Sequence, residues 1–462
     1  MGATRELSEW ILEASYSDFP DETVDCAKGL VLKSIAGMVV GSREPLGKKF
    51  IRYLAGLGGT PEAGVVGAGF RTSVENAAFA AGTFAHASEL EDDEFFPTGD
   101  ACGNYWTHPA IFPLAEKLLS SGREVIEATV VSFEVASRLV QGAPRFGLRV
   151  GVNTPAYVGT LATAAFASRM LNLTVDQTAN ALSIAAAQTA GKACQLGYDA
   201  HFIESGHSCR AGLLSAFLAE AGCRGAPDIL DDRNGFYSSV WCEDENAVDL
   251  NIITDGLGKP PYHVHGAEIK KWSSCNLTHT AVDALEMLVK NHGITNEDVE
   301  RVEAEVNPLC VQYCDRRYPD TLAAARFSYS YLLAEVLLRG RIPDYETFFT
   351  KEKLTDPKFR EIQGKIQVIS RSDWSDGYKG ARLTVVKKDG QQLVNHLEAF
   401  LGHPDNPLTH EQVMDVGRQF VGAIMPENDT KRVVEQVENM EKLVDIRELM
   451  NILTFFTNPR GL

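Results

Sequence analysis

The stretch between Tyr157 and Gly225 constrains the fold most, because it consists largely of Ala, Gly, Ser and Leu in runs of helix length. The runs are TLATAAFASRML, ANALSIAAAQTAG and RAGLLSAFLAEAG. Alanine has the highest helix propensity, and small side chains let two helices approach closely. The stretch therefore predicts helices at the centre of a tightly packed bundle.

Apolar residues recur at helical spacing elsewhere in the first part of the chain. One stripe runs from Val24 to Met38, and a second, from Ile126 to Val140, follows a Ser-Gly start signal. The best apolar run is interrupted by Lys33 and falls short of the ~18 residues that a membrane span needs. We therefore expect a mainly α fold without a membrane bundle.

The pattern changes near Gly266. VERVEAEV alternates as a strand does, and GKIQVISR and GARLTVVKKDGQQLVNHLEAF predict further strands with a short hairpin at Asp389-Gly390. Between them, DTLAAARFSYSYLLAEVLLRG predicts one amphipathic helix that ends at Gly340. The helical pattern resumes late in the chain, where Thr409 is placed to cap a helix.

This order predicts two domains. We expect an all-helical domain built from both chain ends, residues 1–266 and 401–462, and an inserted smaller α+β domain, residues 267–400. In the inserted domain, helices would cover one face of an antiparallel sheet.

Charge and cysteine content narrow the class of protein. Acidic residues outnumber basic ones, 62 to 44, which gives a net charge of −18 that disfavours binding to nucleic acid or to an anionic membrane surface. The nine cysteines are an odd number, and the start MGATRELSEW is no secretory signal. We expect a cytoplasmic protein with reduced thiols.

The densest polar feature is AHASELEDDEFFPTGDACGNYWTHP, residues 85–109. A solvated acidic helix end is the simplest interpretation, but the segment follows an apolar helix and is rich in aromatic residues. Carboxylates near His108 can orient its ring for proton transfer. A divalent metal is the alternative, since the segment offers nitrogen and oxygen ligands at His86, Asp92, Asp93 and His108.

Two further segments carry clustered polar side chains. AHFIESGHSCRAG opens an Ala-rich helix and contains His201, His207 and Arg210, although a capped first helical turn would explain it equally well. GAEIKKWSSCNLTHTAVDAL, with Lys270, falls at the expected domain junction, where ligand pockets are frequent. GVVGAGF lacks the rest of a phosphate loop, and no GxSxG nucleophile motif is present.

Taken together, these segments resemble the MmgE/PrpD family. The resemblance is carried by AAFAAGTFAHASELEDD with WTHP, by KKWSSCNLTH, and by ANALSIAAAQTAG, AARFSYSYLLAEVLLRG and GHPDNPLTHEQV, and it covers nearly the whole chain. It implies an all-α domain, an α+β lid domain, an active site between them, a homodimer, and neither a cofactor nor a metal. Members of the family include dehydratases, decarboxylases and an epimerase of small carboxylic acids.

Three residues match the family pattern: His108 is its THP histidine, Lys270 its signature lysine, and Asp92 the second Asp of its Asp pair. Other positions depart from the pattern and would contact substrate. They are Glu89, Asp93, Asn153 and Thr154, His201 and Cys275. These departures predict a substrate other than cis-aconitate or 2-methylcitrate.

The resemblance implies proton transfer at a carbon next to a carboxylate, which requires a cation for the charge that develops. We assign that role to Lys270, supplemented by Arg210 or Lys271. We expect His108 to be the general base or acid, oriented by Asp92 or Asp93, and His201 to be the second proton-transfer group. His207 and Cys275 complete the expected substrate contacts.

The expected function is a cofactor-independent lyase, a dehydratase or a decarboxylase, acting on a small carboxylic acid. An isomerase or epimerase of a small dicarboxylate is the alternative with the same chemistry. A non-catalytic binding protein on the same fold is the alternative of another class, and a metal-dependent hydrolase is a third.

Overall fold

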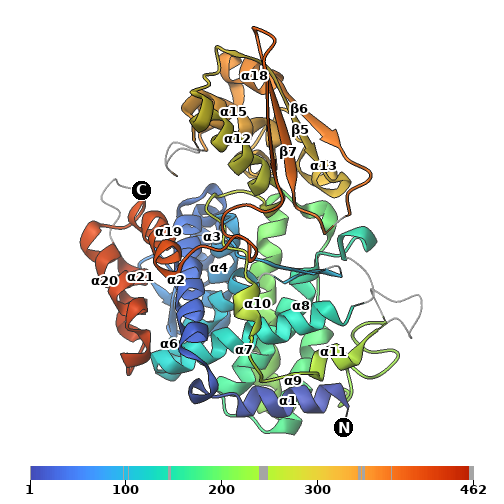
Figure 1. Cartoon of the computed structure of the whole chain (residues 1–462). Helices are drawn as coiled ribbons and strands as arrows, with labels where there is room; N and C mark the ends of the chain where they lie inside the picture. The colour runs from blue at the N-terminus through green and yellow to red at the C-terminus, as the bar shows by residue number, and fades with distance from the viewer. Residues whose placement is uncertain are drawn as a thin grey trace. The chain divides into compact units, whose positions relative to one another are not determined.

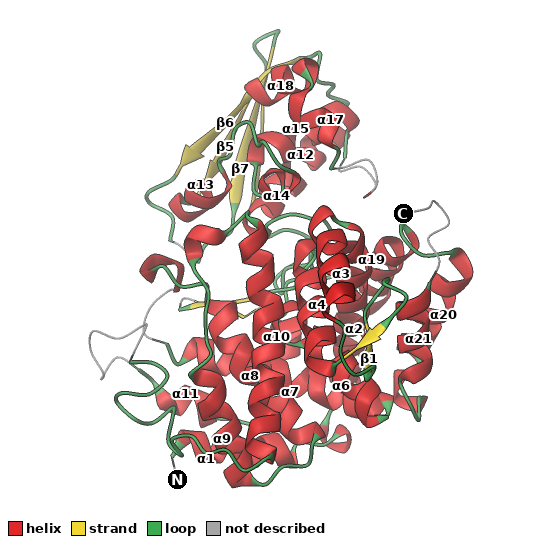
Figure 2. Ribbon diagram, turned by 180° about the vertical axis from the view of Figure 1, so that it is seen from behind, coloured by secondary structure: helices red, strands yellow, loops and turns green. Residues whose placement is uncertain are grey.

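The computed structural model describes residues 2–96, 98–101, 103–143, 147–238, 248–341, 345, 349–375 and 377–456. The chain is mainly helical, as expected (Figure 2). It divides into two compact units. The first comprises Met1–Gln195, Asp199–Ala267 and Thr409–Leu462, and the second comprises Leu196–Tyr198 and Glu268–Leu408.

The first unit is a helical bundle (Figure 1). Its helices before the second unit are α1 (Ala3–Glu13), α2 (Asp21–Arg43), α3 (Pro45–Leu57), α4 (Val74–Ala87), α5 (Gly103–Trp106), α6 (Ile111–Leu118), α7 (Gly122–Gln141), α8 (Thr154–Met170), α9 (Val175–Ala186), α10 (Asp199–Glu220) and α11 (Leu250–Thr254). Its helices after the second unit are α19 (His410–Gly422), α20 (Glu427–Glu438) and α21 (Arg447–Phe455).

Small residues at the centre of this bundle let the helices approach closely, which confirms the packing that the sequence predicts. Helix α4 packs against α2 and α10, and α10 packs against α8. A Cβ atom on Gly41 of α2 would lie 1.7 Å from the carbonyl oxygen of Phe84 in α4. One on Gly212 of α10 would lie 2.3 Å from Cβ of Thr163 in α8. Larger side chains at these positions would push the helices apart.

The predicted helix starts at Ser121 and Thr409 are present. Ser121 caps α7 and accepts a hydrogen bond from the backbone N–H of Glu124, and Thr409 caps α19 and accepts one from Gln412. In both caps the side chain at the third helical position also accepts a hydrogen bond from the backbone N–H of the cap residue, as in a capping box.

The first unit is mainly helical, as expected, and also contains four very short strands. Two short antiparallel hairpins join the helices: β1 (Ala63–Gly64) with β2 (Arg71–Thr72), and β3 (Glu94–Phe96) with β4 (Gly99–Ala101). The second hairpin lies in the polar segment that follows α4. Strand pairing satisfies the backbone there, where the sequence suggested a loop.

The second unit combines helices with one sheet. The helices are α12 (His279–His292), α13 (Pro308–Cys314), α14 (Leu322–Ala325), α15 (Tyr329–Arg339), α17 (Lys351–Thr355) and α18 (Pro357–Gly364). The strands are β5 (Val299–Val306), β6 (Ile366–Ser370), β7 (Ala381–Lys387) and β8 (Gln392–Leu397), in the order β6-β5-β7-β8. Helix α12 packs on β7 and β8, and α15 packs on β6.

Two local expectations for this unit need correction and one is confirmed. The sheet is mixed, because β5 pairs with β6 in parallel and with β7 antiparallel. The single expected helix that ends at Gly340 is split into α14 and α15, since Ser328 starts a new helix by capping the N–H of Tyr331. The hairpin at Asp389-Gly390 joins β7 to β8 as predicted.

Candidate functional site

The end of α4 and the start of α10 bring two buried histidines together. The ring centroids of His86 and His201 are 4.3 Å apart at an interplanar angle of 67°. His86 is 2% exposed and His201 is 6% exposed. The two helices lie side by side (Figure 2), so residues more than a hundred positions apart share one site. We refer to His86, Glu89, Glu91, Asn153, His201 and Glu204 as the histidine cluster.

Two carboxylates face His86. Its Nε2 lies 3.8 Å from Oε1 of Glu89 and 4.0 Å from Oε1 of Glu91, and both contacts are ion pairs only when the ring carries a proton. Glu89 adopts a left-handed backbone conformation with φ of 54°. This conformation costs a non-glycine residue roughly 1–2 kcal/mol and is concentrated at functional sites. The tight turn directs a carboxylate back toward the helix that precedes it.

A second set of polar groups holds His201. The side-chain Nδ2 of Asn153, the residue that precedes α8, lies 3.2 Å from Nδ1 of His201. The same nitrogen donates a 2.8 Å hydrogen bond to Oε2 of Glu204. The other oxygen of Glu204 accepts a 2.9 Å hydrogen bond from the backbone N–H of Lys192.

Aromatic rings enclose the two histidines. The ring of His86 lies 4.8 Å from that of Trp106 and 5.3 Å from that of Phe202, both in edge contact. Exclusion of water strengthens electrostatic interactions inside such a site. The cluster therefore combines groups that can bind protons with a low-dielectric surrounding.

Asp92 is buried, and its carboxylate contacts Asn104 and Lys33. Nδ2 of Asn104 donates a 2.6 Å hydrogen bond to its Oδ2, and Nζ of Lys33 lies 3.5 Å from its Oδ1. Asp93, the next residue, is only 3% exposed. Neither Asp92 nor Asp93 hydrogen-bonds to His108 among the described residues.

His108 lies in an apolar environment instead. The residue is 1% exposed, its ring is in edge contact with Phe133 at 5.2 Å, and neither ring nitrogen has a hydrogen-bond partner among the described residues. Burial lowers the pKa of His108 from 6.5 to about 3, so the ring is neutral at physiological pH. The role of His108 as general base or acid stays a prediction.

The other predicted residues of the first unit lie on α8 and α10. Nε2 of His207 lies 3.1 Å from the backbone oxygen of Gln188. Arg210 is exposed, with its guanidinium 5.6 Å from the ring centre of Phe79. Thr154 is fully buried as the first residue of α8.

The remaining predicted residues belong to the second unit. Lys270 is completely buried. Lys271 forms a 3.0 Å ion pair with Asp283, and its ammonium lies 4.8 Å from the ring centre of Trp272. Cys275, 9% exposed, starts the turn that leads into α12.

The described residues contain one group of side chains with the right spacing for a metal ion. Ligand atoms of His86, Glu89 and His201 all lie within 4.8 Å of one another. This set differs from the His86, Asp92, Asp93 and His108 set that the sequence offered. Which nitrogen of His201 could bind a metal depends on which one carries the proton, and Asn153 lies 3.2 Å from its Nδ1.

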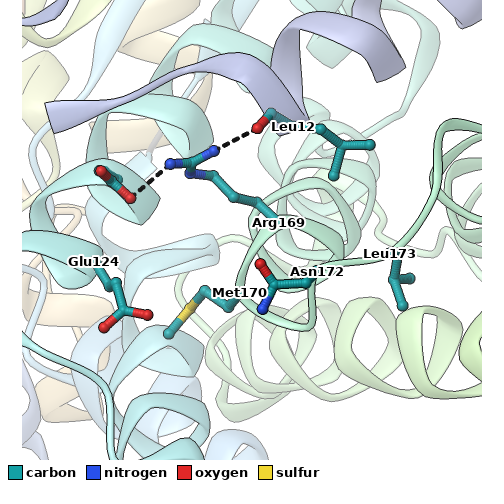
Figure 3. Close-up of a pocket in the computed structure, with 7 residues that line it drawn as sticks. Leu12, Glu124, Arg169, Met170, Asn172 and Leu173 are labelled. Carbon is teal, nitrogen blue, oxygen red and sulfur yellow. Dashed lines mark hydrogen bonds and ion pairs between the residues drawn. The ribbon is translucent and has the colours of Figure 1, made fainter. Parts of the chain in front are cut away.

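A cavity of about 320 Å³ lies elsewhere in the first unit, where α1, α7 and α8 meet (Figure 3). Arg169 points into it but already donates a 2.7 Å hydrogen bond to the backbone oxygen of Leu12 and another of 2.7 Å to Glu127 (Figure 3). Glu124 is used in the cap of α7. The charged groups of this cavity therefore serve to join helices.

Sequence reasoning missed the roles of Glu204, Trp106 and Lys33. The sequence did carry a signal for Lys33, because a charge inside an otherwise apolar helix needs a buried partner. For Glu204 the signal was its i,i+3 spacing from His201 on α10. No spacing rule applies to Trp106, since its ring contacts His86 from another helix.

Comparisons with known proteins match the chain along most of its length. The family model of the MmgE/PrpD N-terminal domain matches residues 5–248, and that of the C-terminal domain matches residues 272–442. Cis-aconitate decarboxylase of Aspergillus terreus is 25% identical, with 98% of this chain and 96% of that protein covered. Cis-aconitate decarboxylases of Mus musculus and Homo sapiens are 26% and 25% identical, covering 83% and 82% of this chain and 79% of each of those proteins. None of the described helices is long and apolar enough to cross a membrane.

Proposed function

The chain belongs to the MmgE/PrpD family, and we propose that this lyase-type enzyme decarboxylates a small di- or tricarboxylic acid. The observation that carries the proposal is the likeness to cis-aconitate decarboxylases over nearly the whole chain. The buried histidine cluster supports it, because loss of CO2 must be followed by delivery of a proton to carbon.

The chemistry assigns different tasks to the two rings. When the C–C bond breaks, CO2 leaves and the electron pair passes into the remaining conjugated carboxylate system. A proton must then reach one of the carbon atoms of that conjugated system, which balances the charge left by CO2. We assign this proton to His86, because Glu89 and Glu91 lie within 4.0 Å and balance the charge of its protonated ring. The ring regains a proton from solvent between turnovers.

The anionic substrate also needs a cation. Of the three basic residues that the sequence offers, Arg210 is exposed and contacts Phe79, and Lys271 is paired with Asp283. We assign the substrate carboxylate to Lys270, a fully buried lysine that matches the signature lysine of the family pattern. The homodimer and the independence from cofactors and metals that the family resemblance implies remain predictions of the same proposal.

The test is NMR of a panel of di- and tricarboxylates incubated with the protein in D2O, with CO2 measured in parallel. We expect one acid to lose CO2 and its product to carry one deuterium on a carbon of the conjugated system, whose position shows whether the double bond has shifted. The panel must include cis-aconitate, although the departures at Asn153, His201 and Cys275 predict a different acid. Loss of water without release of CO2 would make the enzyme a dehydratase. Exchange of a C–H proton for deuterium without loss of water or CO2 would make it an epimerase. No change in any acid would favour the binding protein.

A further inference from the structure

We propose that Glu204 and Asn153 are positioning residues that hold His201 as a neutral ring with its proton on Nε2. His201 then acts as a hydrogen-bond donor to the substrate's developing negative charge, in place of the proton-transfer role that the sequence suggested. The effect on the reaction rests on the proposed function. The state of the ring rests on the geometry of three side chains.

The first step of the argument is the orientation of the Asn153 amide. Both oxygens of Glu204 accept hydrogen bonds, one from Asn153 at 2.8 Å and one from the N–H of Lys192 at 2.9 Å. A carboxylate with two such donors is acceptor-only. Turning the amide over would place its oxygen 2.8 Å from a carboxylate oxygen, with no proton between them. Glu204 therefore fixes the nitrogen of Asn153 toward itself.

The second step is the proton on His201. The same amide nitrogen lies 3.2 Å from Nδ1 of His201, and an amide nitrogen can only donate. Nδ1 must therefore offer a lone pair. A neutral imidazole with its lone pair on Nδ1 carries its proton on Nε2. Asn153 is 4% exposed and His201 6%, so removing this contact would leave a buried polar group unsatisfied.

The third step is the consequence for chemistry. A ring in this state is a poor proton donor, because losing the Nε2 proton would leave an imidazolate. It is also a poor base, because Asn153 occupies Nδ1. It can still donate a hydrogen bond from Nε2, and a fixed donor aimed at developing charge in a dry site accelerates a reaction substantially.

The same proton argues against a metal at His86, Glu89 and His201. A metal at Nε2 of His201 would require the proton to move to Nδ1, where the N–H groups of Asn153 face it. A metal at Nδ1 would displace Asn153. Although three ligand atoms lie within 4.8 Å of one another, the lone pair of His201 at Nδ1 already accepts a hydrogen bond from Asn153.

The experiment is 15N NMR of the ligand-free protein labelled at its histidines, with His201 assigned by its loss in His201→Gln. We expect the Nδ1 signal of His201 in the range of an unprotonated nitrogen and Nε2 in that of a protonated one. His207 is the internal reference, because its Nε2 faces the backbone oxygen of Gln188 and must carry a proton. A protonated Nδ1 on His201 at neutral pH overturns the proposal.

A double variant reverses the hydrogen-bond polarity. Asn153→Asp combined with Glu204→Gln places an acceptor against Nδ1 without setting two carboxylates together. We expect the proton of His201 to move to Nδ1 while the signals of His207 stay unchanged. If the double variant does not fold, the spectrum of the unaltered protein decides alone. An unchanged His201 spectrum in a folded double variant also overturns the proposal.

Two additional measurements separate this inference from the proposed function. In the double variant we expect kcat to fall roughly 100- to 1,000-fold with little change in KM, as for loss of one fixed donor.

Added Zn²⁺ should leave the His201 signals of the unaltered protein in place, and a shift would overturn the inference. If the expected tautomer is found and no acid is decarboxylated, the proposed function fails and the assignment of the ring stands. If an acid is decarboxylated but Nδ1 of His201 is protonated, the proposed function stands and the assignment of the ring fails.

Discussion

Nζ of Lys33 lies 3.5 Å from Oδ1 of Asp92, and both side chains are completely buried. Lys33 also donates a 3.1 Å hydrogen bond to the backbone oxygen of Leu90. Asn104 holds Asp92 from the other side. These contacts tie the middle of α2 to the segment between α4 and β3 that carries Glu89 and Glu91. The acidic segment is thus anchored from within the bundle.

Lys33→Met should lower the free energy of unfolding by about 3 to 5 kcal/mol, because it leaves a buried carboxylate without its cation. Lys49→Met is the matched control, since Lys49 pairs with Asp199 at a similar 3.0 Å with more than half of each side chain exposed. An exposed pair contributes about 0 to 1 kcal/mol. Urea denaturation of both variants measures the difference. If the two variants lost equal amounts of unfolding free energy, the charge of Lys33 would contribute little to stability.

His108 should make the protein less stable in acid. The unfolded chain takes up this proton near pH 6.5, whereas burial holds the pKa in the folded protein at about 3. The unfolded state therefore binds more protons between these values, and acid favours unfolding. The free energy of unfolding is unaffected by this proton above pH 6.5. It falls by about 1.4 kcal/mol per pH unit as the pH drops from 6.5 toward 3.

His108→Gln tests this, because glutamine keeps polarity and approximate size without a proton to gain. We expect the melting temperature of the variant to change less between about pH 7.5 and pH 5 than that of the unaltered protein. Parallel curves for the two proteins would contradict the assignment of His108 as a buried neutral ring.

The fold was largely predictable from the sequence, because its signals are local. Gly212 shows why: it lies in the run RAGLLSAFLAEAG, where small residues predict close helix packing, and it contacts α8 closely. Ser121 and Thr409 start helices by contacts within three residues. The parallel pairing of β5 with β6 was not predictable, since strand direction within a sheet depends on the path of the chain between the two strands.

The candidate site was predictable only in part. The sequence singled out His86, Glu89 and His201, which the structure brings together. Their partners could not be foreseen, because Lys33 reaches Asp92 and Asn153 reaches His201 across helix contacts that no spacing rule describes. Lys33 and Asn104 hold Asp92, and nothing in the nearness of Asp92 to His108 along the chain indicated these partners.

Lys270→Met should weaken carboxylate binding. Loss of a hydrogen bond to a charged group costs about 1.5 to 3 kcal/mol, or roughly 10- to 100-fold in affinity. The measurement is the inhibition constant of the product identified in the NMR panel. Lys271→Met is the control, because Asp283 already binds that ammonium at 3.0 Å, and we expect little change. An unchanged constant in Lys270→Met would remove Lys270 from the site.

Glu94→Gln should destabilise the protein more in mild acid than in alkali. Nδ1 of His263 lies 2.9 Å from Oε1 of Glu94. Burial lowers the pKa of His263, but its hydrogen bond and ion pair with Glu94 outweigh burial, so that the pKa is raised above 6.5. The folded state then binds more protons above that pH, and the resulting stability is complete below pH 6.5 and lost as the pH rises through the raised pKa.

The variant removes the carboxylate that holds this proton, so its loss in melting temperature should be larger at about pH 6 than at about pH 9. As a control, Glu94→Gln is also introduced into the His263→Gln variant, so that the contribution of the Glu94–His263 pair can be separated. In the His263→Gln variant there is no imidazole whose protonation could depend on Glu94. We therefore expect the effect of Glu94→Gln on the melting temperature to become independent of pH. A pH-dependent effect that persists in this background would assign it to another partner of Glu94, such as Ser137, whose hydroxyl donates to Oε2.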